Sequence, residues 1–118
     1  LRSGMTTRLE IDEGFKPEPM AARAVYHAVS EALANSSRHG RATRADIRLS
    51  VRGAGYFEFE ARDDGRGCAT TEGAGRGLGI MRERIESLGG GRVETESEPG
   101  GGFVIRGSFY SSEKQGGE

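Results

Sequence analysis

Two segments in which apolar and polar residues alternate lie on either side of a glycine turn. In ADIRLSVR (45–52) every second residue is apolar, and YFEFEARDD (56–64) repeats the pattern after GAG (53–55). A period of two is the pattern of a strand with one buried face and one solvated face. The sequence therefore predicts an antiparallel hairpin with one side in water.

Two further segments have helical periodicity. The first begins at Pro19, whose missing N–H costs nothing in a first turn, and is expected to end at the glycine cap His39-Gly40. The second covers about 78–88 and is expected to stop at glycines 89–91. The residues expected on the apolar faces are Met20, Ala21, Ala24, Val25, Ala28, Val29, Ala32 and Leu33 in the first helix, and Leu78, Met81, Ile85 and Leu88 in the second.

Three more strands are predicted at 5–12, 92–98 and 102–110, the last two joined by a Pro-Gly-Gly turn. The resulting order predicts an α+β fold, a two-layer sandwich whose mostly antiparallel mixed sheet carries both helices on one face. We expect a single domain over residues 5–112 and a disordered polar tail at 113–118.

Composition excludes several function classes. The formal net charge is -1, so no overall field attracts nucleic acid or an anionic membrane. The single Cys68 cannot form an internal disulfide and is expected to be a small buried filler; no zinc-ligand spacing is present. No apolar run reaches membrane-spanning length, and the N-terminus lacks a signal-peptide pattern. We expect a cytoplasmic domain, and the start at Leu1 favours a piece of a longer protein, which itself can be membrane-anchored.

Asp63 has the same strand parity as Phe57, Phe59 and Ala61, so its carboxylate is expected to face the covered side of the sheet, whereas Asp64 points away. A buried carboxylate is costly unless something pairs with it, and a ligand N–H donor is one such partner. The alternative is structural, because Asp-Asp-Gly is a common way to open a loop.

The first helix carries a polar stripe beside its apolar one. Glu31, Asn35, Arg38 and His39 fall within about a quarter to a third of the helix circumference. Glu31 and Asn35 are one turn apart, and an amide oxygen is a suitable hard ligand for Mg²⁺. A solvated helix flank explains the same pattern and stays open as an alternative.

Gly75, Gly77 and Gly79 lead into the second helix. Free N–H groups and the positive dipole end at a helix N-terminus favour phosphate, and glycines permit close approach. The spacing matches neither the P-loop nor the dinucleotide fingerprint. A flexible linker explains the glycines equally well when they are taken alone.

In combination, these motifs resemble the GHKL superfamily of Bergerat-fold ATP-binding domains. EALANSSRHG resembles its N box, DDGRG its first glycine box and GRGLG its second. The segment from Gly79 to Phe109 is similar to the catalytic ATP-binding domain of two-component sensor histidine kinases that pair with LuxR/NarL-type response regulators. The resemblance covers about residues 6–110.

The resemblance implies a role for each of these positions. Asp63 would accept the adenine amino group, with Gly65 and Gly67 allowing close approach to the ring. Asn35 would ligate the Mg²⁺ that bridges the phosphates, Arg38 and His39 would reach the phosphates, and Glu31 would assist catalysis. Residues 66–74 would form a short lid over ATP. The lid hinge and phosphate-facing helix start would comprise Gly75, Gly77, Leu78 and Gly79.

The expected function follows from this resemblance. The domain would deliver the γ-phosphoryl of Mg-ATP to a His on a dimerisation and phosphotransfer domain, which is absent from this chain, and a response regulator would be the next partner. Neither His27, expected to be exposed, nor His39 lies in an acceptor helix, so the isolated domain, expected to be monomeric, is expected to autophosphorylate poorly. One alternative is an anti-sigma-factor-like serine kinase that regulates by protein binding; another is a regulator that only senses nucleotide.

Overall fold

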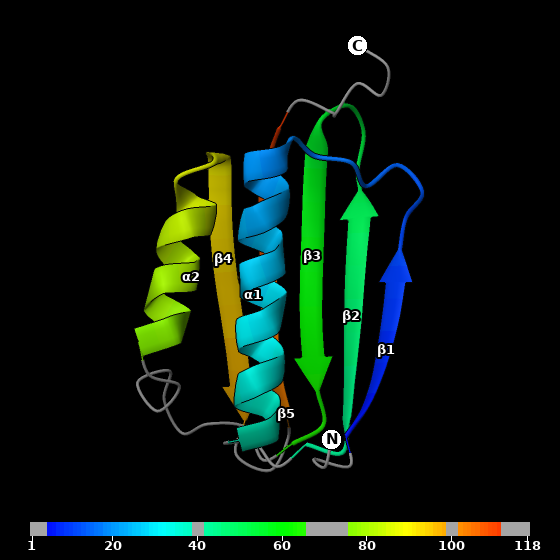
Figure 1. Ribbon diagram of the computed structural model, residues 1–118, viewed down its shortest axis with the longest axis vertical. Helices are drawn as coiled ribbons and strands as arrows, with labels where there is room; N and C mark the ends of the chain where they lie inside the picture. Colours follow the sequence, from blue (N-terminus) through cyan, green and yellow to red (C-terminus); the bar gives the residue numbers. More distant parts are fainter. Residues whose placement is uncertain (1–4, 39–41, 66–75, 99–101, 112–118) are drawn as a thin grey trace.

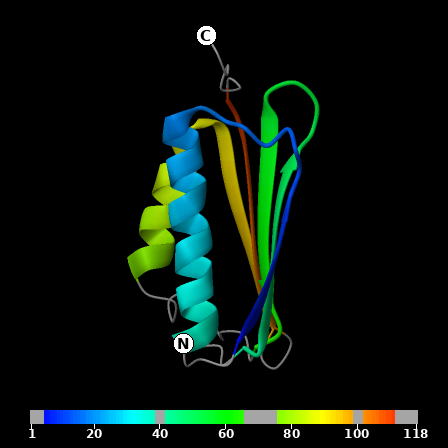
Figure 2. The ribbon, with the colours of Figure 1, turned by 45° about the vertical axis from the view of Figure 1, so that its right-hand side comes forward.

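The computed structural model describes residues 5–38, 42–65, 76–98 and 102–111, and within them a five-stranded sheet carries two helices (Figure 1). Both helices lie on the same side of the sheet (Figure 2). The α+β two-layer sandwich is therefore confirmed. The elements are β1 (Thr6–Ile11), α1 (Pro19–Arg38), β2 (Arg44–Val51), β3 (Tyr56–Asp63), α2 (Arg76–Glu86), β4 (Gly89–Glu98) and β5 (Gly102–Tyr110).

The strand order is β1-β2-β3-β5-β4, with β1 parallel to β2 and the other pairs antiparallel. The predicted hairpin is formed by β2 and β3, and its turn contains Gly53 and Gly55 at φ 74° and 73°, in the left-handed region that glycine tolerates. Asp63 pairs with Ala45 on one side and Phe103 on the other. The last residue of β3 therefore lies in the middle of the sheet, at one end.

The core forms between α1, α2 and the covered sheet face. Helix α1 buries residues spaced three and four apart, as its periodicity predicts. The prediction for Met20 is wrong, since this residue is 75% exposed; it lies roughly 100° around the helix from the centre of the buried stripe. The core members are Ala21, Ala24, Val25, Ala28, Ala32, Ile47, Phe57, Phe59, Ala61, Leu78, Met81, Ile85, Val93, Phe103, Ile105 and Phe109.

Helix α2 ends at Glu86, before the glycines that were expected to stop it. Residues 89–91 instead begin β4, where Gly90 has φ 61° and the register with β5 shifts between Gly89 and Arg92. A Cβ at Gly91 would overlap the backbone of Ile85, so the strand starts close against the helix end. The glycines therefore return the chain from the helix directly into the sheet.

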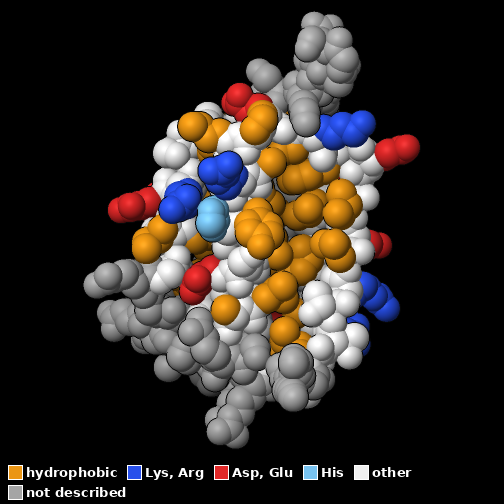
Figure 3. All heavy atoms as spheres, in the orientation of Figure 1, with side chains coloured by type: hydrophobic (Ala, Val, Ile, Leu, Met, Phe, Trp, Pro, Cys, Tyr) orange, Lys and Arg blue, Asp and Glu red, His pale blue; other side chains and the backbone are white. Residues whose placement is uncertain are grey.

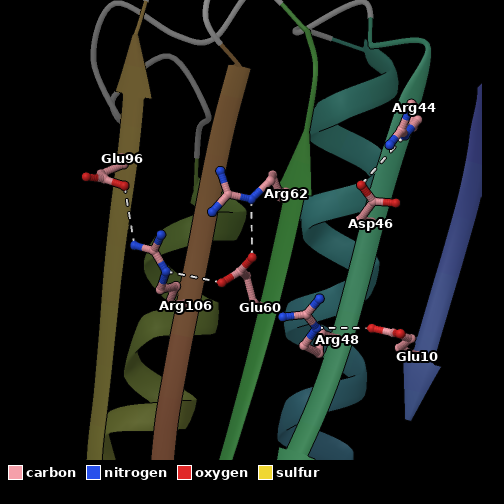
Figure 4. A network of polar contacts seen from close by, with 8 residues as sticks. All are labelled: Glu10, Arg44, Asp46, Arg48, Glu60, Arg62, Glu96 and Arg106. Atoms are coloured by element: carbon pink, nitrogen blue, oxygen red, sulfur yellow. Dashed lines mark hydrogen bonds and ion pairs between the residues drawn. The ribbon is translucent and has the colours of Figure 1, made fainter.

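The opposite face of the sheet carries alternating charges. Glu10, Arg48, Glu60, Arg106 and Glu94 occupy one row across the strands. Arg48 Nε lies 3.1 Å from Glu10 Oε1, and Arg106 Nε lies 3.2 Å from Glu60 Oε1 (Figure 4). Opposite charges across strands stabilise a sheet modestly at exposed sites. This arrangement agrees with the prediction that one face is in water.

The two helices leave part of the sheet face on which they lie uncovered. Leu9 and Ile11 are 56% and 55% exposed, and hydrophobic side chains gather beside α1 over β1 and β2 (Figure 3). Helix cover is therefore centred on the other side of α1, toward α2 and β4. The predicted cap at 39–40, the turn at 99–101, Cys68 and the tail at 113–118 lie outside the described residues.

Candidate functional site

Asp63 is buried at the end of β3. It is 8% exposed and faces the helices together with Phe57, Phe59 and Ala61, all of which are buried. The orientation predicted from strand parity is therefore confirmed. A carboxylate in this position requires hydrogen-bond donors, because burial removes the water that would otherwise solvate it.

The chain itself supplies two of these donors. The backbone N–H of Gly65 donates to Asp63 Oδ1 at an N···O distance of 2.8 Å, and the hydroxyl of Ser36 donates to Asp63 Oδ2. The expectation that a ligand pairs with this carboxylate was therefore incomplete. A carboxylate has about four acceptor sites, so these two bonds leave capacity for a further N–H donor.

Ser36 is a site residue that the sequence analysis missed. It lies in α1, is 6% exposed, and its Oγ is also 2.9 Å from the carbonyl oxygen of Ala32. Ser36 follows the buried residues Ala28 and Ala32 at intervals of four, so its position on the apolar stripe was visible in the sequence. A polar side chain on a buried stripe is a signal that it has a partner across the core.

Asn35 is buried more deeply than a residue at the edge of the helix contact. It is 4% exposed, and its Oδ1 and Nδ2 atoms have no hydrogen-bond partner among the described residues. Buried side-chain amides are nearly always hydrogen-bonded, because an unpaired amide costs free energy. The solvated-flank alternative does not hold for Asn35, whose amide is suited to a ligand.

The side chain of Glu31, in α1, lies against the first turn of α2. The side chain is half-buried, and a Cβ added at Gly77 would overlap its carboxyl group. Only glycine allows the helix start to approach the carboxylate this closely. The same region holds a small hollow of about 120 Å³, lined by His27, Glu31, Gly77, Ile80, Met81 and Arg84. His27 is exposed, as predicted.

The remaining predicted residues divide into two groups. Leu78 is 7% exposed and belongs to the core, while Gly79 is exposed and a Cβ there would meet nothing within 4 Å. The second group comprises residues whose positions or side chains lie outside the described part of the chain: the side chain of Arg38, and His39, Gly67 and Gly75.

Asp64 has a structural role at the edge of this site. Its exposed carboxylate accepts hydrogen bonds from Thr43 Oγ1 at 2.7 Å and from the backbone N–H groups of Thr43 and Arg44 at 2.9 Å. These hydrogen bonds hold the pKa of Asp64 below its ordinary value, and the bond from the Thr43 hydroxyl has the largest effect. Asp64 therefore ties the end of β3 to the start of β2.

The site thus brings together Glu31, Asn35 and Ser36 from α1, Asp63 from β3 and Gly77 from α2. The sequence profile of the histidine kinase-, DNA gyrase B- and HSP90-like ATPases matches residues 20–111. The chain belongs to this ATPase family. The family binds ATP.

The proteins that this ATPase domain resembles include a sensor protein and a histidine kinase. It is 38% identical over 88 residues to the nitrate/nitrite sensor protein NarQ of Escherichia coli, a match covering 72% of this chain and 15% of that protein. The blue-light activated histidine kinase of Erythrobacter litoralis aligns with a TM-score of 0.75 and 25% identity, over 94% of this chain and 36% of that one. Full-length ShkA in complex with AMPPNP aligns with a TM-score of 0.67 and 20% identity, over 95% of this chain and 27% of that one.

The resemblance to catalytic domains of two-component sensor histidine kinases is thereby confirmed. The ATPase domain spans only 15% of the length of NarQ, so the activity of the whole protein is a separate question. Within the residues the structure describes, neither helix has the length and apolarity needed to cross a membrane.

Proposed function

We propose that the domain binds Mg-ATP between α1, the end of β3 and the start of α2, and delivers the γ-phosphoryl group to a histidine on a separate dimerisation and phosphotransfer domain. A response regulator would then receive the phosphoryl group. The observation that carries the proposal is the pair Asn35 and Asp63. Both are buried on neighbouring elements, and both have hydrogen-bonding capacity that the described residues leave unused.

Asp63 would recognise the base. Its carboxylate is an acceptor, and the exocyclic amino group of adenine supplies an N–H donor. Gly65 already donates its backbone N–H to Oδ1 and so holds the carboxylate from one side. Gly67 would permit the ring to approach the backbone closely, the property that glycine contributes to nucleotide-binding loops.

Asn35 fits a Mg²⁺ site through the chemistry of its side chain. Its Oδ1 is a hard oxygen donor that no described residue engages. Mg²⁺ in nucleotide sites takes one or two protein ligands and completes its shell with waters and phosphate oxygens. When bound, the ion supplies charge neutralisation for the phosphates. Arg38, the last residue of α1, would extend positive charge toward them, and His39, the next residue in the chain, would reach them as well.

The start of α2 would bind the phosphates from the other side. Its unpaired N–H groups and dipole favour anions, and Gly75, Gly77 and Gly79 would allow close approach. Leu78 anchors this turn in the core. Glu31, whose carboxyl group lies against Gly77, would orient a reacting hydroxyl or imidazole near this turn. Catalysis would then consist mainly of positioning and charge neutralisation.

The relatives support this assignment. The crystal structure of full-length ShkA, which shares this fold, is a complex with AMPPNP, a nucleoside triphosphate analogue. We further propose that the catalytic domain covers residues 5–112, is monomeric and cytoplasmic when isolated, and contacts neither nucleic acid nor membrane. The phosphoacceptor would lie outside this chain.

A thermal-shift titration with ATP, ADP and GTP, each with and without Mg²⁺, tests nucleotide binding. ATP at one hundred times its Kd is expected to stabilise the fold by about 2.7 kcal/mol, with GTP far less effective. The absence of any nucleotide-dependent shift would contradict the proposal.

Phosphoryl transfer is tested by mixing the domain with labelled ATP and the phosphotransfer domain of the parent protein. Phosphohistidine is acid-labile, whereas phosphoserine is acid-stable. Acid-labile label on the phosphotransfer domain is the expected result. Acid-stable label on a protein partner would instead indicate the serine-kinase alternative.

A further inference from the structure

The Ser36 hydroxyl is enclosed between two acceptors. It is 6% exposed, donates to Asp63 Oδ2 and lies 2.9 Å from the Ala32 carbonyl oxygen. A hydroxyl carries one proton, so it can donate to only one of them at a time. Ala32 O lies within α1, where a helix carbonyl already accepts a backbone hydrogen bond, whereas Asp63 Oδ2 receives no other hydrogen bond from the described residues.

We propose that Ser36 is a positioning residue for recognition of the purine 6-position. It acts through Asp63 and does not touch the nucleotide. This inference rests on the proposed binding of ATP and adds to it a determinant of base selectivity that lies in α1.

The geometric basis is the torsion of the carboxylate. The terminal torsion of an Asp side chain is broad, so one hydrogen bond leaves the carboxylate plane free to turn. Gly65 N–H holds Oδ1 and Ser36 O–H holds Oδ2, and these donors come from different elements. Together they fix the plane, and each oxygen keeps unused acceptor capacity. A fixed plane spares the ordering cost that binding would otherwise incur.

The chemical consequence is selectivity for an amino group. With both donors in place, the carboxylate offers only acceptors to a ligand. An exocyclic amino group at purine position 6 complements it, whereas a 6-oxo group places an acceptor against an acceptor. Sites built around such polar pairs reject analogues that lack the matching group. Ser36 is therefore expected to affect recognition of the amino group and not binding of the rest of the nucleotide.

The test compares ATP with purine riboside triphosphate, which has hydrogen in place of the 6-amino group. Calorimetry would give the Kd of both nucleotides for wild type, Ser36→Ala and Ser36→Cys. Cysteine is similar in size to serine but is a weak donor, so it provides a second variant if alanine impairs folding. Ser30→Ala, an exposed serine on the same helix, is the matched control.

Loss of the Ser36 donor is expected to raise the Kd for ATP by about tenfold and the Kd for the 6-hydrogen analogue by less than about twofold. Ser30→Ala is expected to leave both Kd values unchanged. An equal loss for both nucleotides would show a merely structural role and overturn the inference, as would unchanged ATP affinity. Wild-type protein that binds neither nucleotide would overturn the proposed function as well, which separates the two failures.

Discussion

The carboxyl group of Glu31 in α1 lies directly against Gly77 in the first turn of α2. A Cβ at residue 77 would overlap that carboxyl group, while the same addition at Gly79 would meet nothing within 4 Å. The constraint on residue 77 is thus a side chain and not the backbone. Because Glu31 is long and half-buried, it can move aside, which makes the energetic outcome testable.

Gly77→Ala is expected to change stability by less than about 1 kcal/mol in the wild-type background. Alanine has a helix propensity about 1 kcal/mol better than glycine, but here that gain is offset by displacement of Glu31. In a Glu31→Ala background the carboxyl group that the new Cβ would meet is absent, so Gly77→Ala is expected to stabilise the protein by roughly 0.5–1 kcal/mol. Urea denaturation of the four proteins in this cycle measures the coupling.

Gly79→Ala is the control for this cycle. It lies in the same helix with open space around it, so its effect is expected to be the same in both backgrounds. If Gly77→Ala had equal effects with and without the Glu31 carboxyl group, the contact between these two residues would have no energetic weight.

Asp63→Asn is expected to leave the fold intact and to reduce ATP affinity by more than about a hundredfold. The new amide oxygen can accept from Gly65 N–H, and the new NH₂ can donate to Ser36 Oγ, which then donates to Ala32 O. All internal partners are therefore kept. The ligand, however, would meet a donor in place of an acceptor, a mismatch that binding sites reject strongly.

Calorimetry with ATP and a thermal melt check the two halves of this prediction separately. Asp64→Asn is the control, because Asp64 bonds to Thr43 and Arg44 and faces away from the helices. Wild-type ATP affinity in Asp63→Asn would remove Asp63 from the nucleotide site.

Local patterns in the sequence were sufficient to predict the sheet and the direction of Asp63. The alternation in β2 and β3 sets which residues share a face, and this parity needs no knowledge of distant contacts. The apolar stripe of α1 is local in the same sense. For this reason the fold class, the hairpin and the inward carboxylate all appear in the structure as predicted.

The errors arose where a distant contact decides the structure. Ser36 and Asp63 are 27 residues apart, and only packing of α1 on β3 brings them together. Gly90 was expected to end a helix, but it forms the bent start of β4 because that strand pairs with β5. Met20 has helical spacing and is exposed, because the buried stripe depends on where the sheet lies beneath α1.

The lowered pKa of Asp64 predicts a pH dependence of stability. A carboxyl whose folded pKa lies below its ordinary value of 3.8 stabilises the fold above that value, and the contribution is lost as pH falls through the folded pKa. Asp64→Asn is therefore expected to have a lower urea midpoint than wild type at neutral pH. The difference is expected to shrink below about pH 3.8 and then vanish.

Urea midpoints measured from neutral pH to acid check this dependence. Glu13→Gln, which changes an exposed carboxyl between β1 and α1, is the control and is expected to show a smaller difference at neutral pH. A difference between Asp64→Asn and wild type that stays constant with pH would mean that the ionised carboxylate is not what holds Thr43 and Arg44.

Asn35→Leu is expected to separate stability from nucleotide binding. Leucine has nearly the shape of asparagine, and replacing a buried amide that lacks described partners removes a desolvated polar group, so stability is expected to stay equal or rise by about 1 kcal/mol. The Mg²⁺-dependent part of ATP affinity is expected to disappear, so that the Kd becomes the same with Mg²⁺ and with chelator. Denaturation and calorimetry on one preparation measure both quantities. A loss of more than about 2 kcal/mol of stability would show that the amide serves the fold, and a retained Mg²⁺ effect would exclude Asn35 as its ligand.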